Sequence, residues 1–135
     1  MGLKPKMSNI LNLDEKGFVS AELADIVEID AQDNKYGQEQ YQFIFNCQAK
    51  VKPIQISIWT STKLSAGESN DYNKLTKLLL AIGVVDEGQL PDLSDDDLES
   101  IGERLENLIG KGFKFKLSRT SERSRIKIDS VRLAT

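Results

Sequence analysis

The segment from 54 to 60 constrains the fold of this chain more than any other. Isoleucines occupy every second position there, and between them stand Gln55, Ser57 and Trp59. A period of two places alternate side chains on opposite faces of a β-strand, so the segment is predicted to be a strand with one buried face. The isoleucines then fill a core, and the only tryptophan of the chain lies on the polar face.

Similar patterns predict four more strands and two helices. Alternating apolar residues indicate strands at 18–30, 41–47, 113–117 and 126–133. In the first of these the apolar phase changes near Asp25, which predicts a bulge, and in the last it changes at Asp129-Ser130. Apolar residues at helical spacing predict helices over 72–82 and 94–109. Gly83 and Gly110 are expected to end the helices, and the expected N-caps are Ser69, Asn70 or Asp71 for the first and Ser94 for the second.

The order of these elements is β-β-β-α-α-β-β, which predicts a mainly-β protein with a helical insertion. Three strands, an insertion and two further strands are the order of the OB-fold, a five-stranded Greek-key barrel. An SH3-like barrel is the alternative, and the helical insertion after the third strand favours the OB-fold. We expect residues 1–16 to form an N-terminal arm and residues 17–135 to form one domain, which suits a chain of 135 residues.

The composition excludes several common kinds of catalytic and metal site. The chain has no histidine, which removes the commonest general base and the usual zinc ligand. Its single cysteine, Cys47, excludes an internal disulfide and fits a reducing cytoplasm. No apolar run approaches the length of a transmembrane helix, and no apolar stretch of a secretory signal follows the basic N-terminus. We therefore expect a cytoplasmic protein that is not an enzyme, holds no metal or cofactor and does not bind a membrane.

The charges of the chain are separated into two blocks. The net charge is −3, yet residues 86–106 hold nine acidic residues and one basic residue. Residues 111–132 hold eight basic residues and two acidic residues. A polyanion responds to the local field and not to the net charge, so the second block is a candidate anion-binding surface. The alternative is that the two blocks neutralise each other in the fold.

Five short segments of the chain carry a resemblance to known proteins: Tyr36-Gly37, 41–45, 58–64, 74–83 and 107–111. In the same order, they resemble segments of a group of small bacterial and phage proteins regarded as OB-fold proteins similar to single-stranded-DNA-binding proteins. The resemblance covers roughly residues 17–133. It implies an OB-fold and the binding of single-stranded DNA.

On an OB barrel, the aromatic and basic residues of this chain are expected to share one groove. Trp59 and Tyr36 would offer rings on which bases stack, while lysines and arginines would contact phosphates. For each residue there is a simpler alternative, such as a tryptophan covered by a loop or a solvated basic hairpin. The predicted nucleic-acid-binding residues are Lys35, Tyr36, Gln55, Ser57, Trp59, Lys114, Lys116, Arg119, Arg123 and Arg125.

These observations predict a protein that binds single-stranded DNA without sequence specificity. The sequence leaves RNA open as an alternative to DNA, and a homo-oligomer as an alternative to a monomer. A second hypothesis is an OB-fold interaction module in a phage or plasmid replication or recombination complex, without direct DNA binding. The acidic segment 86–106 would then be the surface that contacts the partner protein.

Overall fold

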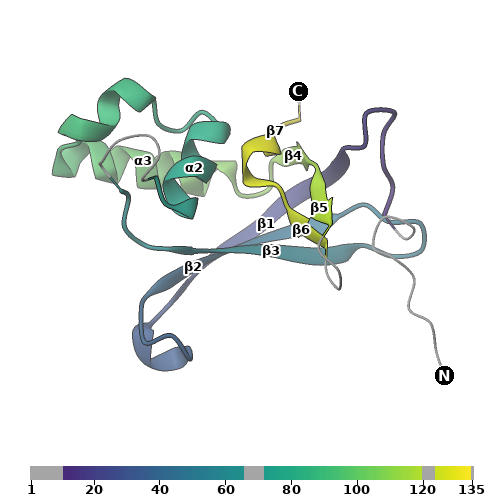
Figure 1. Cartoon of the computed structure of the whole chain (residues 1–135), viewed down its shortest axis with the longest axis horizontal. Coiled ribbons are helices and arrows are strands. Elements are labelled where there is room, and N and C mark those ends of the chain that lie inside the picture. Colours follow the sequence, from purple (N-terminus) through teal and green to yellow (C-terminus); the bar gives the residue numbers. More distant parts are fainter. Residues whose placement is uncertain (1–10, 66–71, 120–123, 135) are drawn as a thin grey trace.

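The computed structural model describes residues 11–65, 72–119 and 124–134, and it is mainly β (Figure 1). Five strands form one antiparallel sheet in the order β3-β2-β1-β4-β7, and two more form a separate hairpin, β5–β6. The strands are β1 (Val19–Ile29), β2 (Gln40–Cys47), β3 (Ile54–Ser61), β4 (Gly112–Phe115), β5 (Leu117–Arg119), β6 (Ser124–Ile126) and β7 (Arg132–Leu133).

Two α-helices lie together on one side of the long strands (Figure 1). They are α2 (Lys74–Ala81) and α3 (Asp95–Leu108). Short 3-10 helices span Ala31–Asp33, Glu87–Asp92 and Ile128–Ser130.

The ends of both helices follow local capping chemistry. Ser94 caps α3 as predicted, because its hydroxyl accepts a hydrogen bond from the Asp97 amide at 3.1 Å. The N-cap predicted for α2 is wrong, since the helix begins later than expected and Asn73 caps it. Gly83 and Gly110 follow the two helices with φ of 77° and 90°, a left-handed conformation that glycine adopts without strain.

The core lies between the inner face of the sheet and the two helices. The aromatic residues of β2 and β4 are at its centre, and the Phe45 ring packs edge-to-face on Phe113 and Phe115. Leucines of α2 and Ile101 of α3 cover this layer. The predicted burial of Phe43, Phe45, Cys47, Phe113 and Phe115 is therefore confirmed.

The predicted bulge in the first strand is also confirmed. The register between β1 and β2 shifts between Leu23 and Asp25, so that Leu23 pairs with Phe45 and Asp25 with Ile44. This shift lets both halves of the long strand keep apolar residues on the core side.

The predicted element order is wrong at the C-terminal end, and the closed barrel is not confirmed. The expected fourth strand divides into β4 and β5 at Lys116, whose amide donates to the Ser130 hydroxyl at 2.8 Å. The expected fifth strand divides into β6 and β7 around the 3-10 turn Ile128–Ser130. The β5–β6 hairpin is consequently separate from the sheet, and β3 lies at the sheet's edge in the described part of the chain.

Part of the predicted N-terminal arm packs against the domain. Leu11 is buried in the core and forms a β-bridge with Ala49, while Leu13 bridges to Val19. Residues 1–10 lie outside the described residues.

Candidate functional site

A groove of about 860 Å³ runs along β3, the edge strand of the sheet. The β5–β6 hairpin forms its opposite wall, the β1–β2 loop closes one end, and the start of α2 adds one residue. Because the sheet is open at this edge, side chains from both faces of β3 reach the groove. The lining residues are Asn34, Lys35, Tyr36, Gln40, Ile56, Ser57, Ile58, Trp59, Lys74, Ser118, Arg125, Ile126 and Ile128.

Trp59 lies on the outer face of β3, as its alternation predicted. It pairs across the ladder with Gln42, and two residues earlier Ser57 pairs with Ile44. Gln42 donates a hydrogen bond from Nε2 to the Ser57 hydroxyl at 2.9 Å, which fixes the polar surface beside the indole. The tryptophan is 43% exposed, so it presents a large part of its ring to solvent at the wall of the groove.

The β1–β2 loop places a second aromatic ring beside the same groove. Asn34 holds this loop, because its Nδ2 donates to the carbonyls of Asp30 and Gln38 at 3.1 and 2.6 Å. Its Oδ1 accepts from the Tyr36 amide at 2.9 Å. Tyr36 is 64% exposed, and the Lys35 ammonium lies 5.2 Å from the centre of its ring.

The charged side chains among the described lining residues are all cations. Lys35, Lys74 and Arg125 contribute three positive charges from three separate elements, and none of the lining residues that the structure describes is acidic. All three side chains belong to exposed residues. The field in the groove therefore favours an anion, although the net charge of the chain is −3.

Five of the ten predicted binding residues meet in this groove: Lys35, Tyr36, Ser57, Trp59 and Arg125. Gln55 is exposed on the same face of β3 but does not line the groove. Arg119 is the last residue of β5, and Arg123 lies outside the described residues.

Lys114 and Lys116 lie at a different place from the prediction. With Arg132 they surround the Phe18 ring, at 5.3, 5.0 and 4.8 Å from its centre. Lys114 belongs to β4, three strand spacings or about 14 Å across the sheet from β3. These lysines are therefore not part of the groove that holds Trp59, and they pack on Phe18.

Several lining residues were not predicted from the sequence. Lys74 is the first residue of α2 and lines the groove, and the helical pattern of 72–82 gave it no predicted role. Asn34 could have been predicted, because it lies in a segment of turn-forming residues where an asparagine side chain often bonds to the backbone. Ile56 and Ile58 are predicted core residues, and Ile58 is buried in the core with Ile56 packed against it. Both also contribute to the groove wall, together with Ile126 and Ile128. Gln40 and Ser118 carried no signal that distinguished them.

The structure offers little that resembles a catalytic centre in its described part. Cys47 is buried, and burial raises the pKa of its thiol to about 11, which keeps it protonated at neutral pH. Hydrogen bonds from the amides of Phe18 and Ser94 lower the pKa of Asp14 and Asp97, which are turn and cap residues. Among the described residues, no three acidic or cysteine side chains are grouped as metal ligands.

None of the helices in residues 11–65, 72–119 and 124–134 combines the length and apolarity needed to cross a membrane.

Comparisons with protein-family models, with curated proteins and with solved structures gave no match to this chain.

Proposed function

We propose that this protein binds single-stranded nucleic acid, with DNA as the ligand, in the groove beside β3. The observation that carries the proposal is the composition of that groove. Two exposed aromatic residues, Trp59 and Tyr36, share it with three cations, and its described lining residues include no carboxylate. Single-strand binding without sequence specificity needs this combination, because rings stack on bases while cations contact phosphates.

Each group in the groove has a role in this proposal. Bases stack on Trp59 and Tyr36, and phosphates lie near Lys35, Lys74 and Arg125. Arginine suits the hairpin position, since its guanidinium can make two parallel hydrogen bonds to one phosphate. The hydroxyls and amides that line the groove, from Ser57, Ser118 and Gln40, can bond to base edges.

The strand arrangement supports placing the ligand here and relating the fold to the OB type. The pairing order β3-β2-β1-β4-β7 matches an OB sheet opened at one edge, with the β5–β6 hairpin opposite β3. OB-folds bind oligonucleotides on the face of strands 2 and 3 and between the loops that follow strands 1 and 4. The β1–β2 loop and the β5–β6 hairpin correspond to those positions.

Titration with oligo(dT) tests the proposal directly. Trp59 is the only tryptophan, so its fluorescence reports on this groove alone. We expect quenching that saturates at low salt, and an oligo(U) titration compares RNA with DNA. An unchanged emission, together with no retention of labelled oligo(dT) at low salt, would exclude the proposed function.

Variants of single residues test which side chains of the groove contribute to oligo(dT) binding. Trp59→Ala should weaken binding of a fluorescein-labelled oligo(dT), measured by anisotropy, by about 1 to 3 kcal/mol, or roughly 5- to 150-fold. Arg125→Gln should weaken it as well. The matched control is Lys127→Gln, which removes an exposed cation next to the hairpin but outside the groove lining. Equal losses from Arg125→Gln and Lys127→Gln would indicate unspecific charge attraction.

A further inference from the structure

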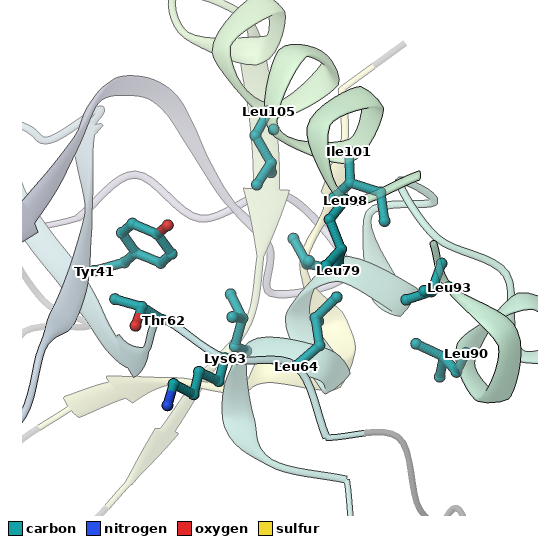
Figure 2. Close-up of a pocket in the computed structure, with 12 residues that line it drawn as sticks. Tyr41, Thr62, Lys63, Leu64, Leu79, Leu90, Leu93, Leu98, Ile101 and Leu105 are labelled. Carbon is teal, nitrogen blue, oxygen red and sulfur yellow. The ribbon is translucent and has the colours of Figure 1, made fainter. Parts of the chain in front are cut away.

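A second groove, of about 450 Å³, lies between α2, α3 and the open end of the β2–β3 hairpin, where β2 begins and β3 ends (Figure 2). It shares no lining residue with the groove beside β3. Its lining residues are Tyr41, Thr62, Lys63, Leu64, Leu75, Leu79, Leu90, Leu93, Leu98, Ile101, Gly102 and Leu105.

This second groove is apolar over most of its wall. Figure 2 shows Tyr41 and Thr62 on the side of the sheet, with the leucines and Ile101 of the helical region opposite them. Leu98 of α3 is 45% exposed although its neighbour Ile101 is buried. An exposed leucine at the edge of an apolar groove is typical of a surface that binds another molecule.

Gly102 lies in the interior of α3 and lines this groove. Glycine destabilises a helix interior relative to alanine, so its presence needs a reason. Its φ is not in the left-handed region, and an added Cβ would meet no atom within 4 Å. The fold of this chain therefore does not require glycine here, whereas a second backbone packed closely against α3 would.

Acidic residues border the apolar stripe of α3. At 100° per residue, Asp95, Glu99 and Glu106 lie on the flank of the stripe formed by Leu98, Gly102 and Leu105, and all three acids are exposed. Arg104, the single basic residue of the segment 86–106, donates from its guanidinium to the Val84 carbonyl at 3.2 Å. The α3 border of the groove is therefore negative and attracts cations, whereas Lys63 places one cation on the opposite border.

We propose that this second groove docks an amphipathic helix of a partner protein, with apolar side chains on one face and lysines or arginines beside them. The apolar face would fill the groove against Leu98 and Ile101, and the close approach at Gly102 suits helix-on-helix packing. The flanking cations would pair with Asp95, Glu99 and Glu106. This inference goes beyond nucleic-acid binding and does not depend on it.

Selection from a display library of 18-residue helical peptides tests this docking site. The library is selected on the full-length chain and counter-selected on Gly102→Leu, whose side chain would fill the groove. We expect enriched peptides with apolar residues at i, i+3, i+4 and i+7 flanked by lysine or arginine. A library that yields no peptide, or peptides with acidic flanks, would overturn the proposal.

Variants then locate the contact on the protein. The best enriched peptide should bind Gly102→Leu and Leu98→Asp at least tenfold more weakly than the wild-type chain. Glu99→Lys should also weaken binding, whereas Ser100→Lys, which adds a cation on the side of α3 opposite Leu98, should change it little. An unchanged circular dichroism spectrum and a cooperative thermal unfolding transition show that each variant is folded. Equal affinity for the wild-type chain and Gly102→Leu would overturn the proposal.

Gly102→Ala gives a second test, in which weaker peptide binding cannot be explained by a less stable fold. We expect this variant to raise the melting temperature, because alanine favours the helix, and to weaken peptide binding. Stronger or unchanged peptide binding would contradict the role of Gly102. Two other occupants would also overturn the proposal: a dimer in sedimentation that Gly102→Leu abolishes, or a small apolar molecule seen by native mass spectrometry.

Discussion

At the scale of single residues, Asn34 determines where the aromatic ring of the β1–β2 loop lies. The Asn34 side chain forms hydrogen bonds to backbone groups of Asp30, Tyr36 and Gln38. These bonds hold a loop in which no apolar side chain is buried. The loop residues around it are exposed or half-buried. Tyr36 and Lys35 thus depend on this one amide for their position beside the groove.

Asn34→Ala should therefore weaken oligo(dT) binding more than it weakens the fold. We expect a several-fold loss of affinity, measured by anisotropy, because Tyr36 and Lys35 lose their fixed position. The free energy of unfolding should fall by about 1 kcal/mol, measured with urea, since the lost bonds are near the surface. Asn12→Ala removes the same side chain from an exposed site away from the groove and should leave affinity unchanged.

Cys47 makes stability depend on alkaline pH. Burial raises the pKa of its thiol from 9.0 to about 11, so between these values the unfolded chain releases a proton that the native chain keeps. Below pH 9 the thiol is protonated in both states and does not change the free energy of unfolding. As the pH rises from 9 towards 11, ionisation of the thiol in the unfolded chain lowers that free energy. The decrease amounts to about 2 to 3 kcal/mol for a shift of this size.

Urea unfolding of the wild-type chain and Cys47→Ala at pH 8 and pH 11 isolates this effect. The wild-type chain should lose more stability than the variant over that interval, because alanine does not titrate. The other titrating groups are common to both chains and cancel in the comparison. If both chains lose the same free energy of unfolding, burial of Cys47 does not perturb its ionisation.

At the scale of elements, one polar cluster connects the end of β3 to the start of α2. Asn73 accepts from the Thr76 amide and hydroxyl at 2.9 and 2.8 Å, and its Nδ2 donates to the Lys63 carbonyl at 2.8 Å. Ser65 completes the cluster, since its amide donates to the Thr76 hydroxyl at 3.0 Å. The cluster fixes the helix that carries Lys74 relative to the strand that carries Trp59.

Asn73→Ala should destabilise the protein by about 2 kcal/mol, because it removes a helix cap and breaks hydrogen bonds to the buried Thr76. Thermal unfolding should show a decrease in melting temperature of roughly 6 to 10 °C. Asn107→Ala changes an exposed asparagine within α3 and serves as the control. A similar decrease in both variants would contradict a special role for Asn73.

The elements that the sequence predicted well are those with long regular patterns. The strands around Phe43, Phe45 and Ile58 and the helix capped by Ser94 formed where alternation or capping chemistry indicated. The C-terminal strands were predicted less well. Their interruption depends on the Ser130 hydroxyl bonding to Lys116, a contact between residues distant in sequence that no local pattern reveals.

At the scale of the whole molecule, the sheet stays open at β3 in the described part of the chain. Half of the predicted binding residues line one groove, and all but Arg125 of these belong to β3 and the β1–β2 loop, whose patterns are regular and local. Sequence reasoning misplaced Lys114 and Lys116 because the closed barrel it assumed would bring strand four closer to β3. In the described structure they gather at Phe18 with Arg132, near the opposite edge of the sheet.

The salt dependence of binding should distinguish these two groups of cations. If only Lys35, Lys74 and Arg125 contact phosphates, the logarithm of the association constant should fall with the logarithm of salt concentration with a slope of about −2. A steeper slope that Lys114→Gln and Lys116→Gln make shallower would show that the nucleic acid extends to Phe18. Anisotropy titrations between 50 and 300 mM salt, on the order of the physiological range, measure this slope.

The open edge of the sheet has a consequence for hydrogen exchange. In an antiparallel edge strand, every second amide points away from its neighbour, so half of the β3 amides face the groove instead of β2. Those amides should exchange with deuterium quickly, while the alternate amides bonded to β2 exchange slowly. A ligand that fills the groove would slow the exchange of only the fast amides. The exchange rates along β3 would then show, residue by residue, how far the occupied site extends.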